Sequence, residues 1–147
     1  MGNLEEAIKL FRFKMKLEKR WSDIDEMGHV NNAIYLTYFE QSRVSYFNEY
    51  MKWNWQEYGV ILANSHVDYI RPLLYPEPTF IYTRISRLGG KSFEVQYLIV
   101  NEKEGEKVLV AKGYTTLVMF DYKTKSSFII PNTIREKVAE YEPALGK

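Results

Sequence analysis

The sequence predicts an α+β fold in which an antiparallel sheet of five or six strands wraps around one long apolar helix. Alternation of apolar and polar residues, which is typical of half-buried strands, recurs along the chain. Residues 32–51 are instead apolar on nearly every side of a helical wheel, as in a central buried helix. The order is one strand, this helix, and then four or five strands separated by Gly and Pro turns. At 147 residues the chain fits one domain, 1–147.

The composition limits the partners and the chemistry. The 20 Lys and Arg residues nearly balance the 19 Asp and Glu residues, whereas general binders of nucleic acid or membrane surfaces carry a basic excess. The absence of Cys excludes disulfides and thiolate nucleophiles. The N-terminus lacks the pattern of a signal peptide, and no apolar run is long enough to cross a bilayer. We therefore expect a cytoplasmic protein with neither nucleic acid nor membrane as a partner.

The first predicted strand spans residues 11–21, where apolar and charged residues alternate. One face carries Phe11, Phe13, Met15, Leu17 and Trp21. Asp23 continues the phase of this face and Asp25 lies two residues further on, so both carboxylates would point to the covered side if the extended geometry continued. Gly28 then breaks the segment.

The helix over residues 32–51 is expected at the centre of the fold. Most of its helical wheel is covered by Ile34, Tyr35, Leu36, Tyr38, Phe39, Val44, Tyr46, Phe47, Tyr50 and Met51. Asn31 or Asn32 can cap its first turn by accepting hydrogen bonds from unpaired backbone N–H groups. Glu40 and Arg43, three residues apart, can pair along its one polar strip.

The later strands are predicted at 60–71, 79–88, 92–100, 107–120 and 128–130. Pro72 and Pro76 end the first of these, and Gly89 and Gly90 turn the chain between the second and third, which indicates a hairpin. A last helix is predicted after Pro131, with a stripe of Ile134, Val138 and Tyr141. One helix leaves sheet edges that need protection, so we expect a dimer that pairs through a sheet edge.

A family resemblance is carried by R-W-S-D-I-D-E-M-G-H-V-N-N-A-I-Y at 20–35 and Y-F-E-Q-S-R at 38–43. This chain resembles the hotdog-fold acyl thioesterases of the 4-hydroxybenzoyl-CoA thioesterase type and their relatives, the plant acyl-ACP thioesterases. Similar pieces follow: V-D-Y-I-R-P-L at 67–73, G-G-K-S-F at 89–93 and A-K-G-Y-T-T-L-V at 111–118. The resemblance implies a hotdog fold, a homodimer or homotetramer with active sites at the dimer interface, and an acyl-CoA or acyl-ACP substrate. Coenzyme A then enters only as part of the substrate.

The resemblance also implies roles for residues near the helix start. The family's catalytic carboxylate is the second Asp of D-x-D-x-x-G, which falls on Asp25, and its polarising amide falls near Asn32. His29 matches the histidine of the plant acyl-ACP enzymes, although their pattern has Asn where this chain has Met27.

The chemistry of thioester hydrolysis leads to the same residues. The reaction needs a group that activates water and hydrogen-bond donors for the oxygen that becomes negative. Asp25 can act as the base or attack the carbonyl carbon directly. The first N–H groups of a helix lack partners within it, so the backbone N–H near Asn32 is the predicted oxyanion donor. Tyr35 belongs to the core by default and can also line an acyl pocket.

Arg84, Arg87 and Lys91 can form a local basic patch for the phosphates of coenzyme A, or simply a solvated face. Only Lys91 has a counterpart in the family, whose two arginines in this turn are replaced here by Gly89 and Gly90. The replacement predicts weaker coenzyme A binding at this turn, or binding by other residues.

Structural interpretations stand beside the functional ones. Asp23 fits a turn-former or helix cap better than a catalytic group. His29 can hydrogen-bond across the turn as readily as contact a substrate, and His66 fits a surface residue. Two distant histidines match no metal-ligand spacing, so we expect no metal site and no cofactor.

The predicted activity is hydrolysis of an acyl-CoA thioester. An acyl-ACP thioesterase is the alternative within enzymes, supported by G-H-V-N-N at 28–32 and by the missing arginines. A non-catalytic hotdog protein that binds acyl-CoA is the alternative outside enzymes. A hotdog hydratase would need an Asp and a His in a different motif.

Overall fold

The computed structural model describes residues 3–147. Its helical elements are α1 (Asn3–Ile8), a 3₁₀ turn (Trp21–Asp23), α2 (Ile34–Tyr46), a π-helical segment (Phe47–Met51) that continues α2, and α3 (Asn132–Tyr141). Its strands are β1 (Phe13–Lys16), β2 (Val60–Tyr69), β3 (Thr79–Leu88), β4 (Ser92–Lys103), β5 (Glu106–Asp121) and β6 (Ser126–Ser127).

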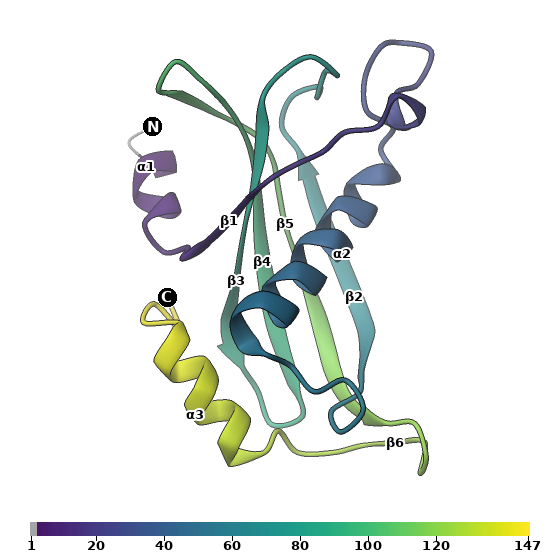
Figure 1. The fold of residues 1–147 in the computed structure, drawn as a ribbon, viewed down its shortest axis with the longest axis vertical. Coiled ribbons are helices and arrows are strands. Elements are labelled where there is room, and N and C mark those ends of the chain that lie inside the picture. Colours follow the sequence, from purple (N-terminus) through teal and green to yellow (C-terminus); the bar gives the residue numbers. More distant parts are fainter. Residues whose placement is uncertain (1–2) are drawn as a thin grey trace.

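The strands form one antiparallel sheet in the order β1-β3-β4-β5-β2, and β6 pairs with the end of β5. Figure 1 shows this sheet curled around α2, which crosses one of its faces, while α1 and α3 lie toward the β1 and β3 side. The predicted α+β class, with six antiparallel strands around one long helix, is confirmed.

The core lies between α2 and the concave face of the sheet. The Phe39 ring stacks on Tyr97 of β4 at 4.2 Å between centroids and 4° between planes. Gly113 of β5 permits this contact, because a Cβ there would meet the Phe39 ring at 2.7 Å. The expectation that the helix is apolar and covered all round is wrong on one side, where Leu36, Val44 and Tyr50 are 42%, 40% and 45% exposed. Within residues 3–147, α2 therefore keeps an uncovered side.

The first strand is shorter than predicted. β1 ends at Lys16, and the chain enters the 3₁₀ turn at Trp21. Between the two, Lys19 Nζ donates to the carbonyls of Leu74 and Glu77 and to the hydroxyl of Thr79. Trp21, predicted on the covered face, is instead 74% exposed. The prediction of a strand at 128–130 is also wrong, because the strand that pairs with β5 is β6, which lies two residues earlier.

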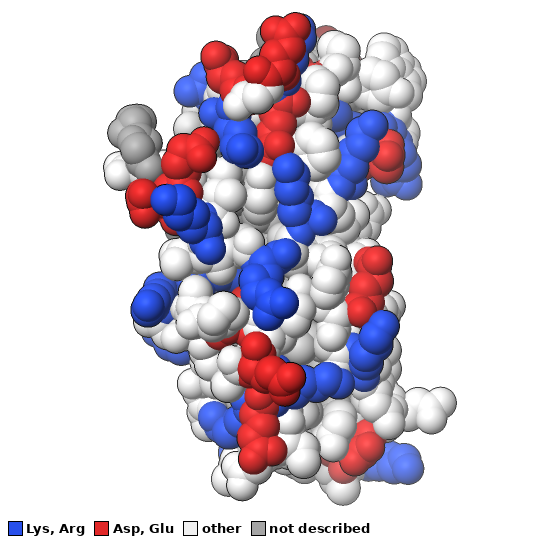
Figure 2. Space-filling model, turned by 60° about the vertical axis from the view of Figure 1, so that its left-hand side comes forward, with Lys and Arg blue, Asp and Glu red and all other residues white. Residues whose placement is uncertain are grey.

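Two predicted charge arrangements are corrected. Arg43 donates to the Tyr97 hydroxyl at 3.3 Å rather than pairing with Glu40 among residues 3–147. Arg84 does not belong to a surface basic patch, because its side chain is 1% exposed and donates to the backbone carbonyls of Ala144 and Lys147. On the face of the molecule in Figure 2, Lys and Arg are interspersed with Asp and Glu.

Strand β2 forms one edge of the sheet, and its outer side has no strand partner within residues 3–147. Eight of its ten residues are exposed, and only Val60 and Val67 are partly buried. A long exposed edge strand is a template for pairing with another chain.

The described part of the chain contains no helix long and apolar enough to cross a membrane.

Candidate active site

The loop between the 3₁₀ turn and α2 holds Asp25 and His29 in a compact reverse turn. Asp25 N donates to the His29 carbonyl at 2.8 Å, and Gly28 N donates to the Asp25 carbonyl at 3.0 Å. Gly28 has φ +82°, a left-handed conformation that glycine adopts without strain. Val30 N donates to the Leu73 carbonyl at 2.9 Å, which docks the loop on the segment after β2.

The two aspartates of the D-I-D sequence lie in opposite environments. Asp23 is 1% exposed and accepts hydrogen bonds from Tyr38 Oη at 2.7 Å and from Arg20 N at 2.9 Å. Burial acts to raise the pKa of Asp23, but these hydrogen bonds and the nearby Arg20 charge outweigh it and hold the pKa below its usual value. Asp23 is therefore a structural carboxylate that ties the loop to α2.

Asp25 is exposed and does not point to the covered side, as it would have done if the extended geometry had continued from the first strand. Its Oδ1 accepts from Met27 N at 2.9 Å and from His29 N at 3.3 Å, as in an Asx turn. Its Oδ2 accepts no hydrogen bond from residues 3–147. One oxygen thus orients the side chain and the other is available for a substrate or a water molecule.

The start of α2 supplies hydrogen-bond donors beside this carboxylate. Asn31 Oδ1 accepts from Ala33 N at 2.9 Å in an Asx turn just before the helix. The predicted cap by Asn31 or Asn32 is wrong, because Ala33 occupies the N-cap position of α2 and no side chain caps the first turn. The Asn32 carbonyl accepts from Tyr69 Oη at 2.9 Å, and the Asn32 N–H donates to no acceptor within residues 3–147. An N–H at the positive end of a helix attracts developing negative charge.

A cavity of about 270 Å³ brings together four of the predicted site residues, Asp25, His29, Asn32 and Tyr35. Burial raises the pKa of Tyr35, whose ring meets Tyr69 edge to face at 4.9 Å. The remaining lining residues are Val30, Tyr69, Ile70, Arg71 and Pro72. The cavity is thus lined by a residue with a carboxylate, Asp25, by a residue with an imidazole, His29, and by Asn32, whose N–H donates to no acceptor within residues 3–147.

The other two predicted site residues, Arg87 and Lys91, lie elsewhere in the chain. Arg87 and Lys91 flank the β3–β4 turn, at the opposite end of the sheet from the loop with Asp25 (Figure 1). Met119 N donates to the Lys91 carbonyl and Met119 lies opposite the first residue of β2, so about 30 Å of strand separates Lys91 from Tyr69. Arg87 is 3.6 Å from the Glu94 carboxylate. A single chain does not bring these cations to the cavity.

Sequence reasoning missed Tyr69 and Arg71 as cavity residues. Both belong to the V-D-Y-I-R-P-L stretch, so the signal was present, but the role of each side chain depends on where β2 ends relative to α2. His66 lies on the exposed side of β2 and pairs with Asp68 at 3.0 Å, as expected of a surface residue. Residues 3–147 contain no cluster of three or more His, Asp or Glu side chains arranged to hold a metal ion.

Comparison with known proteins gives one family. A model described as the thioesterase-like superfamily matches residues 19–140. Long-chain acyl-CoA thioesterase FadM of Escherichia coli (strain K12) is 27% identical over 128 residues, which are 85% of this chain and 96% of FadM.

Solved structures agree with this match. A thioesterase complexed with coenzyme A and Zn from Thermus thermophilus has a TM-score of 0.79 and 31% identity, over 92% of this chain and 97% of that one. A mutant 4-hydroxybenzoyl CoA thioesterase complexed with 4-hydroxybenzoyl CoA has a TM-score of 0.77 over 86% of this chain and 97% of its own. Because its identity is 17%, this second likeness supports the fold alone.

Proposed function

We propose that this chain, which belongs to the thioesterase-like superfamily and is a thioester hydrolase, acts on acyl-CoA. The proposed site of hydrolysis is the cavity beside the start of α2. One observation carries the proposal: Asp25, whose Oδ2 accepts no hydrogen bond from residues 3–147, and Asn32, whose N–H donates to none of them, line the same cavity. A base and an oxyanion donor on one cavity are what thioester hydrolysis requires.

In the proposed reaction, Asp25 accepts a proton from a water molecule whose oxygen attacks the thioester carbonyl carbon. The carbonyl oxygen becomes negative and receives a hydrogen bond from Asn32 N–H, aided by the dipole of α2. The C–S bond then breaks, the coenzyme A sulfur leaves as a thiolate, and the proton on Asp25 passes to it. Direct attack by Asp25 on the carbonyl carbon, through an anhydride, uses the same groups.

His29 and Tyr35 complete the proposed site. The His29 ring borders the cavity and makes no hydrogen bond with residues 3–147, so it is available to the thioester or its leaving group. Tyr35, 3% exposed, provides an apolar wall for the acyl group. We expect His29→Ala to lower kcat without abolishing it.

We further propose a homodimer in which β2 pairs with β2 of a second copy. In an antiparallel pairing, the Tyr69 end of one β2 lies beside the Val60 end of the other. That arrangement brings Arg87 and Lys91 of the second copy nearer to the cavity, where the family resemblance assigns Lys91 to a coenzyme A phosphate. Association of two such dimers would give the homotetramer.

The carrier is tested by a panel of acyl-CoAs and acyl-ACPs of several chain lengths, with release of free thiol as the readout. The relative FadM is a long-chain acyl-CoA thioesterase, which supports inclusion of long acyl chains. Acyl-ACP hydrolysis is the second candidate, favoured by the G-H-V-N-N stretch and by Gly89 and Gly90 in place of arginines. Release from acyl-ACPs alone would refute the acyl-CoA proposal, and release from neither would refute both.

A further inference from the structure

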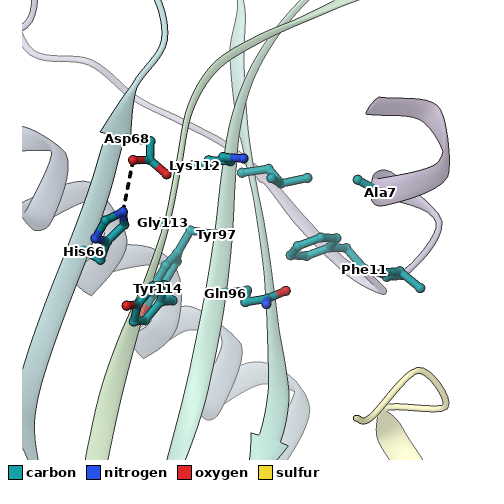
Figure 3. A pocket seen from close by; sticks show the side chains of 11 residues that line it. Ala7, Phe11, His66, Asp68, Gln96, Tyr97, Lys112, Gly113 and Tyr114 are labelled. Carbon is teal, nitrogen blue, oxygen red and sulfur yellow. Dashed lines mark hydrogen bonds and ion pairs between the residues drawn. The ribbon is translucent and has the colours of Figure 1, made fainter. Parts of the chain in front are cut away.

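A hollow lies under α1, on the face of the sheet opposite α2. It has a volume of about 530 Å³ and is bordered by α1, by strands β4 and β5 and by the segment after β2. A second hollow of about 320 Å³ shares Ala7, Leu98 and Lys112 with it and extends to Leu10 and Phe11. Figure 3 shows Ala7 and Phe11 across this second hollow from Lys112. We call the two hollows together the α1 hollow.

The floor of the α1 hollow is apolar and only partly covered. The larger of its two parts has ten lining residues, of which six are apolar: Leu4, Ala7, Ile70, Leu98, Val108 and Leu109. The helix above it, α1, has six residues and none of them is buried. The apolar side chains of α1 pack on a small cluster around Tyr82, Leu98 and Val100 that is separate from the core under α2. Apolar surface left in water favours the binding of an apolar ligand.

A β-bulge places two lysines at this floor. Residues of a strand alternate between its two faces, so Lys107 and Lys112, five positions apart on β5, would lie on opposite faces of a regular strand. The register with β4 shifts at Val110, which is an extra residue in β5. The bulge reverses the alternation, and both lysines line the α1 hollow. Leu109 lines it between them, so a carboxylate above Leu109 is within reach of both flexible side chains.

The same bulge joins the α1 hollow to the candidate active site. The Val110 carbonyl accepts hydrogen bonds from Ile70 N at 3.0 Å and from Arg71 N at 3.1 Å. Ile70 and Arg71 line both the α1 hollow and the active-site cavity. The two sites therefore adjoin one another.

The cations of the α1 hollow have no internal partners. Arg71, Lys107 and Lys112 form no ion pair and no side-chain hydrogen bond within residues 3–147. Among the described residues that line the hollow, Asp68 is the one with a carboxylate, and it is 3.0 Å from His66. Positive charge without an internal partner is available to an anionic ligand.

The nearby carboxylate of Glu102 has partners of its own. Glu102 lies opposite Lys107 in the sheet, but it accepts from Lys14 at 2.8 Å and from Tyr82 at 2.5 Å. Burial acts to raise the pKa of Glu102, but these two bonds and the charges of Lys14 and Lys107 outweigh it and lower the pKa. Glu102 does not line the α1 hollow, so the charge of the lining is positive on balance.

We propose that the α1 hollow binds a free long-chain carboxylic acid. Its carboxylate lies between Lys107 and Lys112, and its alkyl chain runs beneath α1 past Leu98 and Ala7. The inference rests on the proposed function, because such an acid is the product that hydrolysis of a long-chain acyl-CoA releases in the adjoining cavity. It leaves the phosphate of coenzyme A with Lys91 of the second copy. Pairing through β2 extends the sheet at its edge and does not cover the α1 hollow.

The test locates a bound acid directly. The full-length protein is irradiated with dodecanoate that carries a diazirine near the end of its chain, and the labelled peptides are identified by mass spectrometry. We expect label on α1 and on β4 around Leu98. Unmodified dodecanoate should displace this label, whereas dodecyltrimethylammonium, which has the same chain length and the opposite charge, should not.

Variants separate the charge from the apolar floor. Lys107→Gln combined with Lys112→Gln should raise the probe concentration that half-saturates labelling of α1 by about tenfold, the scale of losing two partly exposed charge contacts. The matched control is Lys123→Gln with Lys125→Gln, which removes the same charge from the exposed turn after β5 and should leave this concentration within about twofold. Ala7→Trp fills the part that the two hollows share and should remove the label from β4.

Three results would overturn the inference. The first is label confined to peptides that line the active-site cavity, and the second is equal half-saturation in the two double variants. The third is sedimentation with vesicles of anionic phospholipid that depends on Lys107 and Lys112, which would make this face a membrane contact.

Labelling needs no turnover, so the inference and the proposed function fail separately. If α1 takes the label but neither acyl-CoA nor acyl-ACP is hydrolysed, the proposed function fails alone. If thiol is released and α1 takes no label, the inference fails alone.

Discussion

The substitution Asp25→Asn separates catalysis from structure within the D-I-D sequence. It replaces Oδ2, which accepts no hydrogen bond from residues 3–147, by the NH₂ of an amide and keeps Oδ1, which accepts from Met27 N and His29 N. An amide oxygen can accept both bonds, so the turn is preserved. The change removes the charge and the basicity of Asp25 while leaving the shape of the side chain.

The expected magnitude follows from this geometry. Loss of a general base costs about 10² to 10⁴ in rate, so kcat should fall by about 100-fold or more, or about 2.7 kcal/mol of barrier. Because Asp25 is exposed and its turn bonds survive, the free energy of unfolding should change by no more than about 0.5 kcal/mol. KM should change little, since the amide still fills the same space.

Steady-state thiol release and thermal melting are measured side by side on Asp25→Asn, Asp23→Asn and the unmodified protein. The expected pattern is a folded, nearly inactive Asp25 variant and an active, less stable Asp23 variant. If Asp25→Asn turns over near normally while Asp23→Asn is folded and inactive, the roles within D-I-D are reversed. A large loss of stability in Asp25→Asn would instead show that the carboxylate is structural.

The remaining predictions concern stability and assembly. Asp23→Asn should lower the free energy of unfolding by about 2 kcal/mol, or Tm by about 6 °C, because the Tyr38 hydroxyl loses its charged acceptor. Since the pKa of Asp23 is lowered from 3.8, this stabilisation is present above pH 3.8 and is lost as the pH falls below it. An equal loss of stability at every pH would contradict this. Burial raises the pKa of Glu142 above 4.5, so the pH dependence of its contribution to stability has the opposite sign to that of Asp23. The free energy of unfolding should decline as the pH rises through the raised pKa in the unmodified protein but not in Glu142→Gln. Urea titrations from about pH 4 to 8 check this. Gly113→Ala should lower Tm by the equivalent of about 2 kcal/mol or more, because a Cβ would meet the backbone carbonyl of the neighbouring strand and the Phe39 ring, and an unchanged melt would refute the close packing. Light scattering at micromolar concentration should give at least twice 17.5 kDa, and a clean monomer would exclude pairing through β2.

Much of the fold follows from local patterns in the sequence. The apolar run over 32–51 predicts the central helix, and the Gly89–Gly90 pair and the alternation around it predict the β3–β4 hairpin, because these signals act over a few residues. Pro131 and the stripe that follows it predict α3. The short helix α1 was missed, since six residues are too few for a clear helical period.

The sequence by itself determined the α+β class, the central helix and the stretch 23–35 in which the reactive groups gather. The tertiary structure decided which aspartate is buried and which is exposed, since Asp23 is bonded to Tyr38, fifteen positions away. It also decided that Arg84 is a buried anchor for a segment sixty positions away. The periodicity of apolar residues indicates which face of an element a side chain occupies. The environment of that side chain depends on the distant segment that covers the face, and only the folded chain brings that segment into contact.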